Sequence, residues 1–442
     1  MDEQLRKLCD WVDAHREEIA ADVLESVKNY SPSEDRGAVS KSLDWFAKKA
    51  ASFGFENQLR ANGEVLSVWK GNQDKCVGLI AHADVVPIGD IHQWSHDPRG
   101  ERTDGKIYGR GVLDDKGMAV LCLWCMKGIL ENMDVAWKME TVIGSREEIE
   151  WTDIEQYKKE GWKLPDYSFT PDGNFPMFNR EKGFCNVEFV FKRSGHDELS
   201  LTSIHGAEAS NSVPGAAKAE YSGQVMTAEG KAVHSSIPES GDNALVKLLT
   251  MLDNAGVSAK EFEGLFRFNR ERLSKSHDGA DSLFLQRHPR ELNGEDMGYT
   301  TAVPTMTWLD GDDLHLLINL RTVYGTTREE LNAGFVKVCA EYGCRYIVTD
   351  VMEPLYVPAS LLIVRAMGRA FELITGKKME YELACGTSYA KAFPNCVSFG
   401  PVFPNDGDMC HAPDEYISED NLFTAMKIYL LSLALFLRGQ KN

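Results

Sequence analysis

The chain has 442 residues, of which 43% are hydrophobic and 26% charged, and its formal net charge is −19. This balance is typical of a folded globular protein and excludes a disordered or fibrous chain. The length predicts two domains, or three. A strongly acidic surface repels phosphate backbones, so we expect no nucleic-acid partner.

The two ends of the chain give no membrane or export signal. Residues 1–6 are charged and lack the apolar run of a signal peptide. The longest apolar stretch near the C-terminus, 428–437, is shorter than the roughly 20 residues that a membrane-spanning helix needs. We therefore expect a cytoplasmic protein with no membrane partner.

Ten cysteines are scattered along the chain, which is too long to need disulfide staples. Cys122 and Cys125 form a C-x-x-C sequence inside an apolar run. Their helical spacing predicts two thiols in the core rather than a redox or zinc pair.

The first 180 residues alternate between helical and strand patterns. Residues 1–60 predict helices, one of them an amphipathic helix over 40–53 that ends at Gly54. The following elements are strands at 66–69 and 76–81, a buried helix over 117–130 and a strand over 135–143. The alternation predicts an α/β sheet covered on both faces, with the strand at 76–81 in its middle.

From about Gly183 the pattern changes to amphipathic strands. These are strands at 184–192, 314–321 and 344–350, with a helix over 327–342. A helix over 359–375, a strand at 396–399 and a final helix then return to the first pattern. We predict an α/β domain with a mixed sheet, residues 1–181 and 354–442, interrupted by an inserted α+β domain of ferredoxin-like type, residues 182–353.

His82 and Asp84 directly follow the apolar strand at 76–81. Ligands in open α/β sheets bind at the carboxyl ends of strands. Residues two apart in a strand share a face, so Asp84 can orient the His82 ring for metal binding. The pair alone fits a structural hydrogen bond equally well.

Asp114 and Asp115 lie in a glycine-rich segment, 109–117, just before the buried helix. Two adjacent buried carboxylates repel unless a cation lies between them. A glycine-rich turn in which one aspartate caps the helix is the structural alternative.

Three further positions complete the candidate set. Glu147 and Glu148 follow the strand over 135–143, where one acid can hold a metal and the other move protons. Asp172 lies in a turn-forming segment, and His411 lies in a loop before the last helix. Each alone fits a turn or loop residue. Together, with the acids expected after strands of one sheet, they predict a mixed nitrogen and oxygen site suited to zinc, manganese or cobalt.

The order of these motifs resembles that of the two-metal peptidases that include dipeptidase V, carnosinase, aminoacylase, carboxypeptidase G and succinyl-diaminopimelate desuccinylase. The likeness covers nearly the whole chain and is greatest to the dipeptidase V branch. It rests on His82-Ala-Asp84, the segments 109–117 and 170–176, Glu147-Glu148 and His411.

The resemblance implies a role for each residue. His82 and Asp172 would hold one ion, Glu148 and His411 the other, and Asp114 would bridge them beside a cis Asp114–Asp115 peptide. Asp84 would orient His82, and Glu147 would act as general base and then acid. Two divalent ions, zinc before manganese or cobalt, would activate a water that attacks the peptide carbonyl of a dipeptide.

The insert would act as a lid over a small peptide substrate. By resemblance, His234 would reach over the scissile carbonyl, and Asn211 and Arg321 would contact the substrate. Without the resemblance, a loop histidine and a surface salt bridge explain these residues. The long insert favours a monomer that supplies its own His234, with a dimer as the alternative.

Thr387 and Lys391 lie in a segment that resembles the loop near the substrate carboxylate. The chain departs from the family at Lys391, where arginine is usual, and at Cys385, where glycine is usual. Lysine lacks the planar two-bond grip of arginine, so carboxylate recognition is expected to differ.

Two other functions compete with a dipeptidase. A deacylase of N-acyl amino acids would need no free substrate amine, and Asp172 argues against it because several family deacylases have glutamate there. A binding homologue without catalysis should have lost a ligand or the base, and all seven core residues are present.

Overall fold

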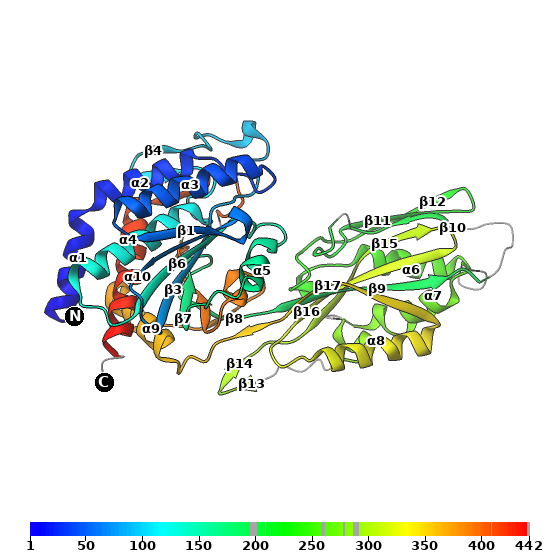
Figure 1. Cartoon of the computed structure of the whole chain (residues 1–442). Coiled ribbons are helices and arrows are strands. Elements are labelled where there is room, and N and C mark those ends of the chain that lie inside the picture. The colour runs from blue at the N-terminus through cyan, green and yellow to red at the C-terminus, as the bar shows by residue number, and fades with distance from the viewer. Residues whose placement is uncertain are drawn as a thin grey trace. The chain divides into compact units, whose positions relative to one another are not determined.

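The structure, a computed structural model, describes residues 1–194, 201–207, 209–257, 261–276, 279–285, 291–407 and 409–439. The chain forms two compact units (Figure 1). The first unit comprises Met1–Asn179, Val357–Glu382 and Thr387–Asn442, and the second comprises Arg180–Tyr356 with Leu383–Gly386. The second unit thus begins two residues earlier than the predicted insert, ends three residues later, and adds a short later segment.

A mixed sheet forms the centre of the first unit. Its strands, in spatial order, are β1 (Glu56–Arg60), β2 (Val65–Lys70), β6 (Lys138–Gly144), β3 (Cys76–His82), β7 (Tyr167–Thr170) and β20 (Cys396–Ser398). The sheet continues into β8 (Phe178–Glu181), which pairs with β18 (Leu355–Tyr356) and β19 (Glu382–Ala384). Strand β3 runs parallel to both β6 and β7, and all seven of its residues are buried. It therefore occupies the middle of the sheet, as predicted.

Helices cover both faces of this sheet. They are α1 (Glu3–Ala14), α2 (Arg16–Lys28), α3 (Arg36–Ser52), α4 (Lys116–Asn132), α5 (Thr152–Lys159), α9 (Leu362–Thr375) and α10 (Glu419–Gly439). Adjacent residues of β6 point to opposite faces. The Thr141 hydroxyl lies 3.1 Å from Met126 Sδ on α4, whereas Glu140 lies 3.5 Å from the Tyr157 hydroxyl on α5. The predicted α/β class is confirmed.

Helix α10 is long and apolar enough, by length and composition, to cross a membrane. However, 72% of its most apolar stretch is buried inside the unit, as in the core helix of a folded domain. Cys125 of α4 packs against it with its Sγ 3.7 Å from Met426 Sδ, and Cys122 is buried beside it. Both thiols lie in the core, as predicted.

A second, small sheet of the first unit brings two distant loops together. It contains β4 (Glu101–Thr103), β5 (Lys106–Tyr108) and β21 (Tyr416–Ser418), with β5 in the middle. Because β5 precedes the loop of Asp114 and β21 follows that of His411, the pairing of these strands sets the two loops side by side. The expectation that all the acids follow strands of one sheet is therefore wrong for Asp114.

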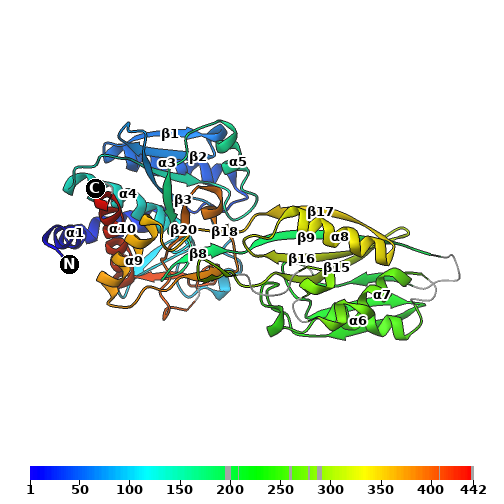
Figure 2. The ribbon, with the colours of Figure 1, turned by 90° about the horizontal axis from the view of Figure 1, so that it is seen from below.

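The second unit is built on an antiparallel sheet of β15 (Thr301–Asp310), β16 (Asp313–Thr322), β9 (Gly183–Lys192) and β17 (Cys344–Met352), in that spatial order. Its helices are α6 (Ala244–Asn254), α7 (Glu263–Glu271) and α8 (Arg328–Tyr342). The three helices lie along the strands of this sheet (Figure 2). Alternate β9 residues such as Val187 and Phe189 join residues of all three helices in one core. The βαββαβ order with this strand arrangement is ferredoxin-like.

The sequence analysis missed several strands of this unit. They are β15, the sheet of β10 (Leu201–His205), β11 (Ala216–Tyr221) and β12 (Gln224–Glu229), and the hairpin of β13 (Glu291–Leu292) and β14 (Glu295–Asp296).

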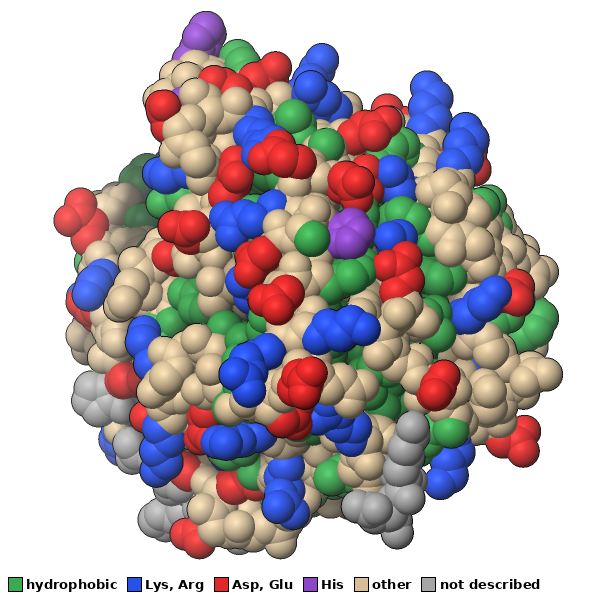
Figure 3. Space-filling view, turned by 90° about the vertical axis from the view of Figure 1, so that its left-hand side faces the viewer, with side chains coloured by type: hydrophobic (Ala, Val, Ile, Leu, Met, Phe, Trp, Pro, Cys, Tyr) green, Lys and Arg blue, Asp and Glu red, His purple; other side chains and the backbone are tan. Residues whose placement is uncertain are grey.

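On the face of the molecule drawn in Figure 3, acidic side chains are interspersed with lysine and arginine rather than gathered in one patch.

Candidate functional site

His82 is the last residue of β3 and is fully buried. Its Nδ1 lies 3.0 Å from the carbonyl oxygen of Asp84 and 3.3 Å from Asp84 Oδ1. A carbonyl oxygen can only accept a hydrogen bond, so Nδ1 carries the proton in that contact. Its Nε2 then faces Asp114 Oδ1 at 2.9 Å and, among the described residues, finds no hydrogen bond of acceptable geometry. This is the tautomer that a metal ligand requires.

The Asp84 carboxylate is the common support of two parts of the site. It is fully buried and accepts hydrogen bonds from Ser33 Oγ at 2.8 Å and from the backbone N–H groups of Glu147 and Glu148 at 3.2 and 3.3 Å. Burial alone raises the pKa of Asp84, but the hydrogen bonds from His82 and Ser33 outweigh it and hold this pKa below its ordinary value. Asp84 is thus an anion that fixes His82 and the turn after β6 together.

Asp114 lies between two imidazoles. Its Oδ1 faces His82 Nε2, and its Oδ2 lies 3.0 Å from His411 Nε2. The Asp114–Asp115 peptide is cis, and Asp115 accepts a 3.1 Å hydrogen bond from the backbone N–H of His82. A carboxylate that presents one oxygen to each of two histidines has the arrangement needed to bridge two cations.

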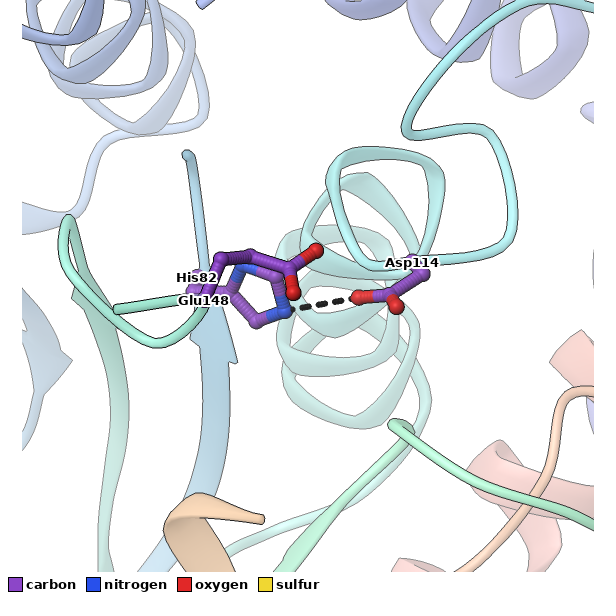
Figure 4. A group of neighbouring side chains, drawn as sticks. All are labelled: His82, Asp114 and Glu148. Carbon is purple, nitrogen blue, oxygen red and sulfur yellow. Dashed lines mark ion pairs between the residues drawn. The ribbon is translucent and has the colours of Figure 1, made fainter. Parts of the chain in front are cut away.

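Two acids of the turn after β6 surround this carboxylate. Glu148 Oε1 lies 3.2 Å from His411 Nε2, and Figure 4 shows the Glu148 carboxylate beside the His82 ring, with Asp114 opposite. Glu147 is turned inward, and its Oε1 is buried without a hydrogen-bond partner in the described part of the chain. Burial and the neighbouring Asp172 raise the pKa of Glu147 well above its ordinary value.

Asp172 follows β7, and its Oδ2 lies 3.9 Å from His82 Nε2. Two overlapping groups of possible metal ligands result, in each of which the ligand atoms all lie within 4.8 Å of one another. One contains His82, Asp114 and Glu148, and the other contains His82, Glu147 and Asp172. Strands β3, β6 and β7 are parallel neighbours, so the residues after them meet at one sheet edge.

His411 is half exposed, with 51% of its side chain accessible. Hydrogen bonds to Asp114 and Glu148 raise its pKa to about 10. The neighbouring carboxylates thus favour a positive charge at this position. Two imidazoles and several buried carboxylates that attract a positive charge fit divalent cations such as zinc, manganese or cobalt.

A buried ion pair that the sequence analysis missed holds the loops of both Asp114 and His411. Arg110 Nη1 lies 2.6 Å from Glu415 Oε2, and both side chains are nearly inaccessible. Arg110 Nη2 donates to the His411 carbonyl at 3.1 Å, while Glu415 accepts the backbone N–H of Leu113 at 2.9 Å. Their opposite charges, each within four residues of a predicted ligand, were the only signal in the sequence.

The three predicted lid residues lie in the second unit and form a cluster of their own. Arg321 Nη2 lies 3.3 Å from His234 Nε2, and the Asn211 carbonyl accepts the backbone N–H of Ser235 at 2.9 Å. Burial, with Arg321 and Lys182 nearby, lowers the pKa of His234 to about 4. This imidazole is therefore uncharged at neutral pH.

The two predicted contacts for the substrate carboxylate lie in the first unit, apart from that cluster in the chain. Thr387 precedes the short helix η6 (Tyr389–Ala392), and Lys391 lies within it. The backbone N–H of Lys391 donates to the Ser388 carbonyl at 3.2 Å. Cys385, the other departure from the family, lies in the second unit.

Comparison with known proteins finds a matching family model and several similar proteins. The family model described as peptidase family M20/M25/M40 matches residues 78–434. The protein named "Putative dipeptidase SH1171" from Staphylococcus haemolyticus is 29% identical over 450 residues, covering 92% of this chain and 93% of its own. A relative named "Putative dipeptidase SSP1012" from Staphylococcus saprophyticus is 30% identical over 400 residues, covering 82% and 83%.

Two solved structures share the fold over 99% of both chains. They are the dipeptidase Dug1p of Saccharomyces cerevisiae, with a TM-score of 0.66, and human carnosine dipeptidase 1, with a TM-score of 0.61. Each is 15% identical in sequence.

Proposed function

Because the chain belongs to peptidase family M20/M25/M40 and is therefore a peptide-bond hydrolase, we propose that it cleaves dipeptides with two bound divalent ions. The observation that carries the proposal is the Asp114 carboxylate, which faces a histidine with each of its oxygens, while Glu147 Oε1 lies buried nearby without a hydrogen-bond partner among the described residues. No structural need explains a buried carboxylate oxygen left in this way.

The ligand atoms divide between two ions. His82 and Asp172 would hold one ion, Glu148 and His411 would hold the other, and Asp114 would bridge them. When bound, the ions supply Lewis acidity, which polarises the substrate carbonyl and lowers the pKa of water. Zinc suits this ligand set best, and manganese and cobalt remain alternatives.

Glu147 moves the protons. Burial and neighbouring carboxylates raise its pKa, which makes the carboxylate a stronger base towards the attacking water. In its protonated form it can then deliver that proton to the leaving amine. Asp84 assists indirectly, because it binds the backbone N–H of Glu147 and holds the His82 ring.

The second unit would act as a lid. We assign to His234 the polarisation of the scissile carbonyl oxygen, a role for which an uncharged imidazole is suited. Arg321 and Asn211, which lie beside it, would contact the substrate, and Thr387 and Lys391 would bind its carboxylate. With the whole insert in one chain, a monomer can supply all of these groups, and we propose a cytoplasmic monomer.

A dipeptide is favoured over an N-acyl amino acid as substrate. Relatives about 30% identical over most of the chain carry the name dipeptidase. Asp172, rather than glutamate, is the residue expected where a free substrate amine is read. An N-acyl amino acid offers no such amine.

The test is amino-acid release from a panel of free-amine dipeptides, including β-alanyl-histidine, and of N-acetyl amino acids. The protein is stripped of metal and reloaded with zinc or manganese. We expect metal-dependent release from dipeptides, lost in Glu147→Gln and kept in Glu150→Gln, whose side chain is 69% exposed in the same turn. Release from the N-acetyl compounds alone would move the assignment to a deacylase, and no release at all would favour a binding homologue.

A further inference from the structure

The turn from Ser145 to Glu148 carries both acids of the proposed site, and its backbone is held from two sides. Asp84 binds the N–H groups of Glu147 and Glu148 on one side. On the other side lies a buried pair, Asp153 of α5 and Tyr389 of η6, to which neither the sequence motifs nor the proposed chemistry gives a role.

Asp153 and Tyr389 bind the two N–H groups that precede the acids. The Tyr389 hydroxyl donates to Asp153 Oδ2 at 2.7 Å, and the same oxygen accepts the backbone N–H of Ser145 at 2.7 Å. The hydroxyl oxygen of Tyr389 also accepts the N–H of Arg146, at 3.3 Å. Four successive N–H groups, from Ser145 to Glu148, are therefore bound by buried side chains.

The pair also packs against the ends of strands β6 and β3, next to the proposed metal ligands. A Cβ placed on Gly144, the last residue of β6, would come within 2.5 Å of Tyr389 and 2.7 Å of Asp153 Oδ2, so only glycine allows this approach. The Tyr389 ring meets the His82 ring edge-on, with the centroids 6.2 Å apart. Trp151 packs on Tyr389 at 5.2 Å and donates from Nε1 to the Glu147 carbonyl at 2.8 Å.

We propose that Tyr389 and Asp153 are positioning residues that fix the Glu147–Glu148 turn relative to His82. Neither is proposed to touch the substrate or a metal ion. They act through the backbone of the turn and through the edge of the imidazole. The inference deepens the proposed function and rests on it. Since Tyr389 lies between Thr387 and Lys391, it also ties the proposed carboxylate-binding segment to the catalytic acids.

The physical basis is the burial of the pair. A buried aspartate is unfavourable unless its oxygens accept hydrogen bonds, and here one oxygen accepts two. Removing the tyrosine hydroxyl leaves the N–H of Arg146 unpaired and takes one donor from Asp153. The turn then loses part of the support that sets where Glu147 and Glu148 point.

The test compares Tyr389→Phe with a matched control, Tyr429→Phe, in the full-length chain. Tyr429 is also buried, but its hydroxyl has no hydrogen-bond partner within the described ranges. For Tyr389→Phe we expect about 10- to 100-fold weaker zinc binding, measured by competition with a chromophoric chelator, as for other residues that orient ligands. For dipeptide hydrolysis we expect kcat to fall by about tenfold or more while KM changes less than about threefold. Tyr429→Phe should match the wild type in each.

Asp153→Asn provides a second variant, in case the tyrosine variant does not fold. The two changes break one shared contact, so their effects on zinc affinity should not multiply in the double variant. Unaltered zinc affinity and kcat in either single variant, with only a lower urea midpoint, would reduce the pair to a structural role. If the wild type hydrolyses no dipeptide, the proposed function fails, and zinc affinity still decides this inference.

Discussion

Replacing Asp84 by asparagine should lower the unfolding free energy of the protein, because one buried backbone N–H loses its acceptor. Each carboxylate oxygen of Asp84 accepts from a different set of donors: Oδ1 faces His82 and the N–H of Glu147, and Oδ2 faces Ser33 and the N–H of Glu148. Whichever way the new amide turns, its NH2 group points at donors. The Ser33 hydroxyl can rotate to accept, so the least unfavourable arrangement leaves one backbone N–H unpaired.

The expected loss of unfolding free energy follows from this one unpaired N–H group. One buried N–H without an acceptor costs about 1–3 kcal/mol of unfolding free energy. Because the amide also ceases to hold the His82 ring as an anion does, zinc binding should weaken by about 10- to 100-fold. Ser33→Ala removes one hydrogen bond to the charged Asp84 carboxylate and should cost about 1.5–3 kcal/mol.

Urea unfolding of the metal-free protein measures the first quantity, and chelator competition measures the second. Asp44→Asn serves as the control, since Asp44 is exposed on α3 and its change should stay within about 0.5 kcal/mol. An Asp84→Asn variant as stable as this control, with unchanged zinc affinity, would refute the role given to Asp84.

Three further outcomes are expected. Arg110→Met should lower the unfolding free energy by about 3–5 kcal/mol in urea titrations, because it strands the buried Glu415 carboxylate; a loss below 1 kcal/mol would contradict this. A thiol reagent should leave Cys122 and Cys125 unmodified in the native protein, as mapped by mass spectrometry, and modification of either would place them outside the core. His234 has a pKa of about 4 when folded and 6.5 ordinarily, so unfolding binds a proton between these values. Wild-type stability should therefore fall more steeply than that of His234→Gln as pH drops from about 6.5 towards 4, and parallel curves would argue against the depressed pKa.

The sequence predicted the strands and helices correctly where the hydrophobic patterns were long. Strand β3 and helix α4 each contain a long apolar run, and the alternation of strands and helices around them predicts a covered sheet. Strands β10 and β12 were missed because their burial is partial and irregular. Strand β11 does alternate, but its buried residues are the small side chains Ala217 and Ala219, which give a weak hydrophobic pattern. Strand β15 contains Pro304 and a register shift, both of which mask a strand pattern.

The sequence predicted the residues of the candidate site, but not the residues that hold them in place. His82 is the last residue of one of three neighbouring parallel strands, and Glu148 and Asp172 follow the other two, so these residues meet at one edge of the sheet. Asp114 is brought to the same site by the pairing of β5 with β21. No local pattern in the sequence predicts this pairing.

The residues that hold the site in place depend on tertiary contacts. Ser33 reaches Asp84 across 51 positions, and Tyr389 reaches Asp153 across 236. A lone serine or tyrosine carries no periodic or motif signal, so only the folded structure reveals its partner.

The measurement that tests the central claim most directly is a metal titration of the stripped protein. Bound zinc per chain is measured by mass spectrometry of the metal, and dipeptide hydrolysis is followed in the same samples. The arrangement of Asp114 between His82 and His411 predicts that full activity requires two ions per chain and that an Asp114→Asn variant binds fewer than two. Full activity in the metal-free protein, or with no ion retained at saturating zinc, would contradict a two-metal peptidase.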